Sequence, residues 1–214
     1  MKNRILDDAA GVASLAAELV AEALRAGART LALAGGTTPA RAYQLLARMP
    51  LDWGRVVVLF GDERCVPPGH PDSNYRMARE TLLDQVFPMT VHRMPGELGP
   101  DEGARLYEGV VRANSPLDLV LLGIGPDGHT ASLFPGHPEL RAAGHAVGVR
   151  AAPKPPPERI SLTLTALREA RRVVVLATGE DKADAIALAR DGVVPAGMIP
   201  EAEYLLDRAA AARL

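Results

Sequence analysis

The sequence predicts an α/β fold in which helices cover both faces of a mostly parallel sheet. Short apolar runs of strand length alternate with longer segments whose apolar residues recur at helical spacing. Several runs are apolar at every position, as expected of strands buried on both faces. The chain has 214 residues, 48% hydrophobic and 23% charged, so residues 1–214 can bury the core of one such domain.

The first unit of this pattern is a helix, a strand and a second helix. Asp8–Ala26 has apolar residues at helical spacing, an aspartate at its start and Gly27 as a C-cap. Thr30–Ala34 is a short apolar run that ends at two glycines, which predicts a strand and a turn. Pro39 then suits the first position of the next helix, with Thr38 as its N-cap.

The next two units repeat the alternation. Val56–Phe60 is a buried strand, and a polar loop leads from it to a helix predicted over Ser73–Val86. A helix near Asp101–Arg112 precedes a strand at Leu117–Leu122, which ends in a glycine-rich loop. Both strands should lie in the parallel sheet, because helices separate them.

The last third of the chain completes the sheet. Pro153–Pro157 contains four prolines and predicts a stiff, extended connector. The remaining predicted elements are strands at Arg159–Leu164, Arg172–Ala177 and Tyr204–Asp207 and a helix at Asp181–Arg190.

Composition limits the partners. The 24 basic and 26 acidic side chains give a formal net charge of −2, so we expect no general attraction for nucleic acid or anionic membranes. The apolar runs are shorter than the roughly 20 residues that span a bilayer, and Asp7 and Asp8 interrupt any export signal. Cys65 is the only cysteine, which excludes an intrachain disulfide and favours a cytoplasmic location.

The loop after the first strand is a candidate anion site. Ligands of open parallel sheets bind beyond the carboxyl ends of the strands. Gly35 and Gly36 bring backbone without side chains to the start of a helix, and Thr37 and Thr38 add two hydroxyls. Unpaired N–H groups at such a terminus favour a phosphate or carboxylate. A tight turn with an ordinary cap is the alternative interpretation.

The loop after the second predicted strand carries adjacent charges. Asp62, Glu63 and Arg64 directly follow a buried strand, where desolvated charge must be paired. Either these side chains serve a site or they form a solvated, salt-bridged turn. Cys65 is predicted to be packed rather than reactive, because no base accompanies it.

The loop after Leu122 contains the candidate catalytic residues. Gly123–Gly128 matches the spacing of a dinucleotide-binding loop, but Pro126 lacks an N–H group and Asp127 would repel a pyrophosphate. The glycines instead predict close approach of a ligand to His129, with Asp127 orienting the imidazole as a general base. A histidine here could also merely bond a carbonyl. No compact set of metal ligands surrounds it.

Two further cations are candidates for anion binding. Lys182 lies in the predicted first turn of a helix, where the helix dipole disfavours a positive charge. Arg159 begins its predicted strand. Each is either exposed or positioned to meet an anion.

Together these motifs resemble the 6-phosphogluconolactonases, in the family that also contains glucosamine-6-phosphate isomerases. The block from Asp127 to Pro135 is highly specific, and the resemblance spans most of the chain. The sequence departs from the family at Ala34 and Thr37, where serine is usual. The matching segments are Gly35–Pro39, Gly61–Pro67, Ser73–Tyr75, Gly123–Pro135, Arg159 and Thr178–Lys182.

The resemblance implies a three-layer α/β/α, Rossmann-like fold similar to glucosamine-6-phosphate deaminase and ribose-5-phosphate isomerase. It implies hydrolysis of 6-phospho-D-glucono-1,5-lactone in the pentose phosphate pathway without a cofactor. We expect no metal, and a monomer or a homodimer. His129 would be the general base and Asp127 its support. The implied substrate-binding residues are Gly35, Gly36, Thr37, Thr38, Asp62, Arg64, Gly125, Arg159 and Lys182.

Two other functions remain open at this point. A deaminase or isomerase on the same fold needs a carboxylate base shortly after the loop histidine, and residues 130–136 contain no acid. A non-catalytic sugar-phosphate sensor would need neither His129 nor Asp127, and no helix-turn-helix segment or basic tail accompanies the domain. Both observations favour the lactonase.

Overall fold

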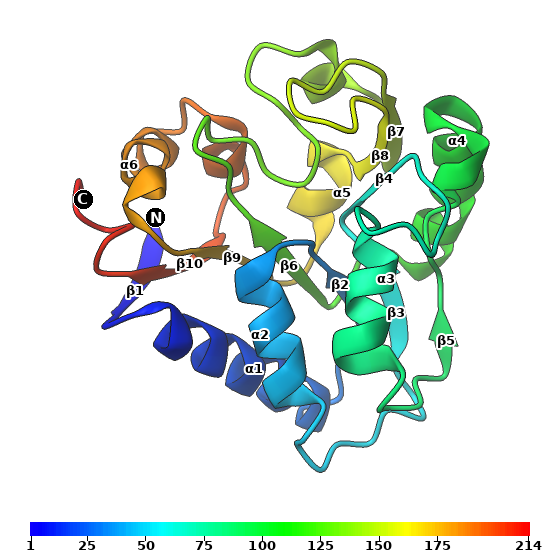
Figure 1. Ribbon diagram of the computed structural model, residues 1–214, viewed down its shortest axis with the longest axis horizontal. Coiled ribbons are helices and arrows are strands. Elements are labelled where there is room, and N and C mark those ends of the chain that lie inside the picture. Colours follow the sequence, from blue (N-terminus) through cyan, green and yellow to red (C-terminus); the bar gives the residue numbers. More distant parts are fainter.

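The computed structural model describes residues 1–214, and its strands form two sheets (Figure 1). The larger sheet has seven strands in the order β1-β10-β9-β6-β2-β3-β5, and all neighbours pair in parallel. The predicted parallel α/β architecture is therefore confirmed. Its strands are β1 (Lys2–Leu6), β2 (Thr30–Leu33), β3 (Val57–Phe60), β5 (Thr90–Val91), β6 (Leu119–Gly123), β9 (Val173–Ala177) and β10 (Glu203–Asp207).

The smaller sheet was not expected. Its antiparallel strands are β4 (Asp62–Arg64), β8 (Arg159–Leu162) and β7 (Ala146–Val149), in the order β4-β8-β7. The prediction of a loop at residues 62–64 was therefore wrong, as was the placement of the Arg159–Leu164 strand in the parallel sheet. Gly61 explains the change of direction: its N–H donates to Leu33 of β2, and its carbonyl accepts from Leu162 of β8. The chain thus leaves one sheet and enters the other at this residue.

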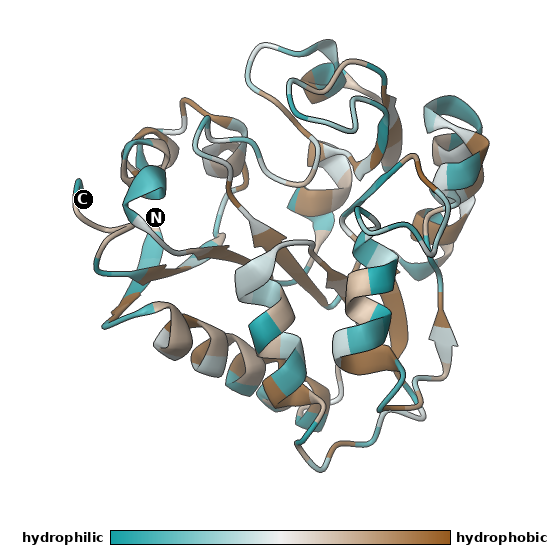
Figure 2. Cartoon of the chain, viewed as in Figure 1, coloured by the Kyte–Doolittle hydropathy of each residue, from teal (hydrophilic) through white to brown (hydrophobic).

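Helices cover the large sheet on both sides. Figure 1 shows α1 and α2 on one side of the strands, and α5, α6 and the small sheet on the other. The strands in the middle are apolar, whereas the outer helices carry polar surface (Figure 2). The helices are α1 (Ala9–Arg25), α2 (Thr37–Leu46), α3 (Asn74–Ala78), α4 (Pro100–Asn114), α5 (Leu164–Glu169) and α6 (Ala183–Arg190).

Two predicted helix starts have different outcomes. Asp8 caps α1 as expected, since its carboxylate accepts a hydrogen bond from the Gly11 N–H at 2.8 Å. Thr38 does not cap α2. The helix begins two residues earlier than predicted, at Thr37, and Gly36 is its N-cap with φ 108°. The Thr38 hydroxyl instead shares a 2.8 Å hydrogen bond with Thr178. The Thr38 side chain thus bonds the residue that follows β9 instead of capping its own helix.

Three other segments differ from their predictions. The helix over Ser73–Val86 is capped by Ser73 but ends at Ala78, and a π-helical turn continues it to Leu83. The helix at Asp181–Arg190 starts with a 3₁₀ turn over Glu180–Lys182 before α6. The connector at Pro153–Pro157 is bent rather than extended, because the Ala152 N–H donates to the Pro157 carbonyl at 2.9 Å and closes it into a loop.

One continuous core of 54 buried hydrophobic residues contains side chains from both sheets and from the helices around them. Strands β2 and β6 lie next to each other at its centre, and the chain proceeds outward in opposite directions from them. A crevice is expected beyond the carboxyl ends of such a strand pair. None of the helices has both the length and the apolar character required to cross a bilayer.

Candidate functional site

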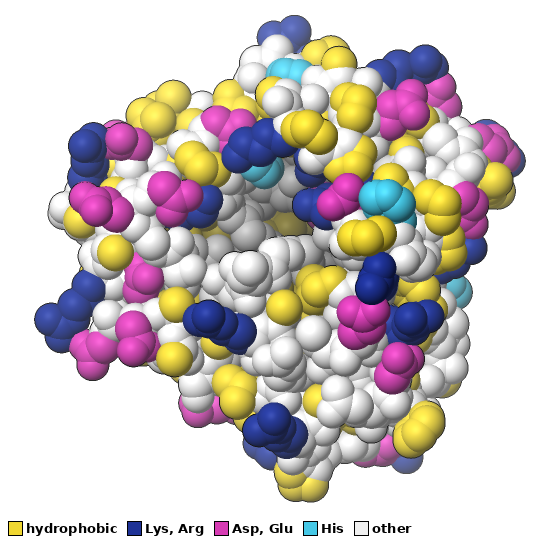
Figure 3. Space-filling model, viewed as in Figure 1, with side chains coloured by type: hydrophobic (Ala, Val, Ile, Leu, Met, Phe, Trp, Pro, Cys, Tyr) yellow, Lys and Arg dark blue, Asp and Glu magenta, His cyan; other side chains and the backbone are white.

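A cavity of about 310 Å³ lies at this point of the large sheet. Figure 3 shows the hollow, with basic side chains at its rim and histidine surface within it. Loops after β2, β3 and β6 form its floor, and the small sheet forms one wall. Of the predicted site residues, those that line it are Gly35, Gly36, Asp62, Arg64, Gly125, His129, Arg159 and Lys182.

His129 presents one ring nitrogen to Asp127 and leaves the other free. The His129 Nδ1 and Asp127 Oδ1 atoms are 2.5 Å apart, and the same oxygen accepts from the His129 backbone N–H at 3.3 Å. No protein group bonds Nε2. The imidazole lines the cavity, whereas Asp127 lies behind it and does not. Asp127 therefore acts on the site through His129, by fixing the ring and its Nδ1–H tautomer.

The surroundings of His129 favour its neutral form. Burial lowers the pKa of His129, the hydrogen bond and charge of Asp127 oppose this, and the charge of Lys154 reinforces it. Burial alone would raise the pKa of Asp127, but the hydrogen bond from His129 outweighs it, and the net pKa is lowered. At neutral pH the pair is thus a carboxylate and a neutral imidazole with an unoccupied lone pair, as a general base requires.

Two glycines are needed because functional side chains pack directly on them. A Cβ on Gly125 would lie 2.1 Å from both Nδ1 and Cε1 of His129, and a Cβ on Gly35 would lie 2.0 Å from Oδ1 of Asn74. Neither space admits a methyl group. These glycines therefore let the His129 and Asn74 side chains pack directly on the backbone; the close approach of a ligand stays a prediction.

The two acids after β3 have different roles. Asp62 lines the cavity, and its carboxylate accepts hydrogen bonds from Asn74 Nδ2 at 3.1 Å and Ser132 Oγ at 2.7 Å. Glu63 points away from the cavity. Burial raises the pKa of Glu63, against the effect of hydrogen bonds from Ser73 Oγ and the backbone N–H groups at 64, 74 and 75. Glu63 therefore anchors the start of α3.

Cys65 is packed, as predicted. Burial raises the pKa of its thiol to about 12, so the thiolate form is scarce at neutral pH and the side chain is a poor nucleophile.

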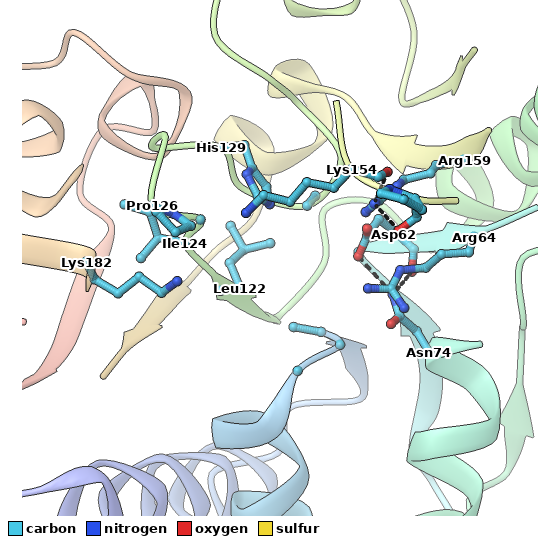
Figure 4. Close-up of a pocket in the computed structure, with 18 residues that line it drawn as sticks. Asp62, Arg64, Asn74, Leu122, Ile124, Pro126, His129, Lys154, Arg159 and Lys182 are labelled. Atoms are coloured by element: carbon cyan, nitrogen blue, oxygen red, sulfur yellow. Dashed lines mark hydrogen bonds between the residues drawn. The ribbon is translucent and has the colours of Figure 1, made fainter. Parts of the chain in front are cut away.

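Cationic groups stand at opposite ends of the cavity. Figure 4 places Lys182 at one end and Arg64 and Arg159 at the other, with His129 between them. Arg64 donates from Nη1 to the Asp72 carbonyl at 2.5 Å, while its buried Nε has no partner in the protein. A buried donor without a partner is costly and marks a place where a ligand can bond.

The two threonines line an adjoining hollow. This hollow, of about 210 Å³, shares Gly35, Gly36 and Lys182 with the main cavity and adds Thr37 and Thr38. The Lys182 ammonium is 2.8 Å from Asp181 Oδ2, and its side chain remains mostly buried. The predicted anion-binding loop and Lys182 thus face the same space.

Sequence reasoning missed two polar side chains of the cavity. Asn74 reaches it from the start of α3, and Lys154 reaches it from the bent loop at residues 152–157. Asn74 was visible only as part of the family motif, and Lys154 was hidden in a segment interpreted as a connector. No cluster of three or more His, Cys, Asp or Glu side chains in the structure could hold a metal ion.

The model of the family described as glucosamine-6-phosphate isomerases/6-phosphogluconolactonase matches residues 7–206. The chain belongs to this family. A 6-phosphogluconolactonase from Streptomyces coelicolor is 40% identical over 96% of this chain and 89% of its own length. Another from Mycobacterium leprae is 42% identical over 77% of this chain and 75% of its own.

Solved structures agree with the membership of the family. The 6-phosphogluconolactonase of Thermotoga maritima superposes with a TM-score of 0.88 at 26% identity, covering 96% of this chain and 98% of that one. A monomeric glucosamine-6-phosphate deaminase superposes with a TM-score of 0.85 at 21% identity, which shows a shared fold. The expected likeness to the deaminase fold is confirmed, and the relatives named as lactonases are similar over most of the chain.

Proposed function

We propose that this protein hydrolyses 6-phospho-D-glucono-1,5-lactone to 6-phospho-D-gluconate, the lactone-opening step of the pentose phosphate pathway. The observation that carries the proposal is the His129 imidazole, bonded to Asp127 through Nδ1 and open to a cationic cavity through Nε2. The relatives of similar length are named for this activity. No acid follows His129 before residue 139, so the carboxylate that a deaminase needs there is missing.

In the proposed mechanism, the substrate lies with its carbonyl carbon near His129. The Nε2 lone pair removes a proton from a water molecule as the water oxygen attacks that carbon. The resulting oxyanion collapses, the bond between carbon and ring oxygen breaks, and the imidazolium returns its proton to the ring oxygen. Asp127 supports the transient imidazolium. General-base catalysis of this kind contributes roughly 10²–10⁴-fold.

The phosphate is assigned to the end of the cavity that has the glycine and threonine loop. Thr37, Thr38 and Lys182 line one hollow, and the N-terminus of α2 supplies N–H groups there. Asp62 and Arg64 then contact the sugar, since they lie at the opposite end of the cavity. Gly35, Gly36 and Gly125 complete the set of residues proposed to contact the substrate. Arg159 also lines the cavity, but its guanidinium bonds carbonyls of the loop at residues 152–157, so we assign it to the substrate site through that loop.

Three broader predictions accompany the activity. Residues 1–214 act as one lactonase domain, which the continuous core supports. The protein works in the cytoplasm, in keeping with its single, partly buried cysteine. It acts as a monomer or a homodimer.

The test is an assay of the purified protein with freshly prepared lactone, following acid release at constant pH and subtracting spontaneous opening. The wild-type protein should accelerate hydrolysis, and His129→Ala should lose kcat with little change in KM. The same protein should release no ammonia from glucosamine 6-phosphate. Ammonia release without lactone hydrolysis would assign the chain to the deaminases instead.

A further inference from the structure

The wall of the cavity at residues 152–157 carries one charged side chain that enters the cavity, Lys154. Figure 4 shows this side chain extending from its loop toward the His129 ring. Its ammonium has no partner in the protein: the only hydrogen bond of Lys154 is one that its carbonyl accepts. Lys182, by contrast, is paired with Asp181. Lys154 is therefore the lysine of the cavity whose charge is left for a ligand.

Arg159 holds the loop that carries Lys154. This arginine is 5% exposed, and its Nε donates to the Pro156 carbonyl at 3.0 Å. Its Nη2 donates to the Lys154 carbonyl at 2.9 Å and to the Pro155 carbonyl at 3.4 Å. The Phe134 ring lies 5.7 Å from the guanidinium carbon and supports it from one side. Because prolines have no backbone N–H, the loop itself offers few donors for its carbonyls. The Arg159 guanidinium supplies these donors and so holds the loop in place.

The charge of Lys154 reaches the catalytic histidine. It acts on His129 together with burial to lower the pKa of the imidazole. The proposed reaction builds negative charge on the lactone carbonyl oxygen within reach of His129. A cation beside the imidazole therefore lies near the place where this negative charge appears.

We propose that Lys154 is a further catalytic residue, whose ammonium stabilises the oxyanion formed when water attacks the lactone carbonyl, and that Arg159 is its positioning residue. The assignment rests on the proposed lactonase function. As the water oxygen bonds to the carbonyl carbon, His129 takes the water proton and the carbonyl electron pair moves onto oxygen beside Lys154. When the carbonyl re-forms, the ring bond breaks and the proton passes from His129 to the ring oxygen. Lys154 keeps its own proton throughout.

The first test replaces Lys154 by methionine, which keeps most of the length and removes the charge. The kcat should fall by about 10²–10³-fold, the effect of losing one oxyanion donor, while KM changes little. The acid limb of the kcat/KM profile should move to higher pH, because loss of a nearby cation raises the pKa of His129. Lys154→Arg should recover part of kcat. Lys154→Gln repeats the test should the methionine variant fail to fold.

Lys2→Met is the matched control. Lys2 lies on the exposed strand β1, paired with Glu201 at 2.8 Å and outside the cavity. The same chemical change there should leave kcat, KM and the pH profile at their wild-type values.

The second test concerns Arg159. Arg159→Lys keeps the positive charge but cannot bond several loop carbonyls at once. It should lower kcat and move the acid limb in the same direction as Lys154→Met. The double variant should be no slower than Lys154→Met, because both changes remove the same interaction. Independent, multiplying losses would refute the positioning role.

The outcomes separate this assignment from the proposed function. An inactive wild-type protein would refute the lactonase and the assignment with it. An active wild-type protein, together with a Lys154→Met variant of normal kcat or an unmoved acid limb, would refute the assignment alone. A variant with raised KM and normal kcat would also refute it, since Lys154 would then bind the phosphate or sugar equally in the ground and transition states.

Discussion

The contact between Gly125 and His129 allows the catalytic pair to be disturbed without changing either of its members. In Gly125→Ala the new Cβ would lie 2.1 Å from Nδ1 and Cε1 of His129 and 2.6 Å from Oδ1 of Asp127. These distances are far below van der Waals contact, so both side chains must move. The backbone need not, because Gly125 has no positive φ that an alanine would resist. The variant should fold and lose the hydrogen bond between Asp127 and His129.

The expected loss is that of a misplaced general base, about 10²–10⁴-fold in kcat. At about 1.36 kcal/mol for each factor of ten, this corresponds to roughly 2.7–5.4 kcal/mol of transition-state stabilisation. The assay is acid release from the lactone at constant pH, with thermal unfolding measured on the same sample. A wild-type kcat in a folded Gly125→Ala protein would refute the role given to His129.

Gly109→Ala serves as the control for that experiment. Gly109 lies on the exposed side of α4, and a Cβ there meets no atom within 4 Å. Alanine should leave kcat unchanged and stabilise the helix by roughly 0.5–1 kcal/mol. Loss of activity in this variant would mean that glycine replacement as such is harmful to the fold.

Four more predictions follow from other parts of the structure. The acid limb of wild-type kcat/KM should lie below pH 6.5, since burial lowers the pKa of His129 from that value, and Asp127→Asn should move the limb lower still; a limb above 6.5 contradicts this. Lys182→Met should raise KM and spare kcat, as steady-state kinetics will measure. Gly103→Ala would place a Cβ 2.2 Å from Ile160 Cδ1, between α4 and β8; overpacking should cost about 1–3 kcal/mol in urea unfolding, and unchanged stability would show that the small sheet can shift. Burial lowers the pKa of His145, but the hydrogen bonds and charges of Glu169 and Glu108 outweigh burial, and the net pKa is raised. This histidine therefore stabilises the fold fully below pH 6.5, and the stabilisation is lost as pH rises through the raised pKa. Urea unfolding of His145→Gln should lack this pH dependence.

The parallel sheet could be predicted because its central strands are apolar at nearly every position. In the short runs at β2, β3, β6 and β9, Thr30 at the start of β2 is the only polar side chain. Such apolar runs are typical of strands covered by helices on both faces. Strand β1 was missed for the opposite reason. Four of its five residues are exposed at the sheet edge, so it shows no apolar run. The pairing of Lys2–Leu6 with Glu203–Asp207 is a contact between the two ends of the chain, and no pattern within either segment predicts it.

The functional residues could be predicted where they lie close together in the sequence. Asp127 and His129 are two positions apart in a glycine-rich loop, and their pairing follows from that spacing. Lys154 is 25 residues from His129 in the chain and enters the cavity only because Arg159 bends its loop. The different roles of Asp62 and Glu63 could not be predicted from the sequence either. Neighbours on a strand point to opposite faces, and the strand itself was not predicted.

The abundance of proline in the loop at residues 152–157 has a thermodynamic consequence. Four of its residues have φ angles restricted by their rings before the chain folds, so ordering the segment sacrifices little conformational freedom. The loop that carries Lys154 is thus pre-organised before the substrate binds, and it does not have to close over the bound molecule. Crystals grown with and without phosphogluconate should superpose here to within about 1 Å, as in other pre-organised complexes. Binding energy is then left for the reaction rather than for ordering the protein.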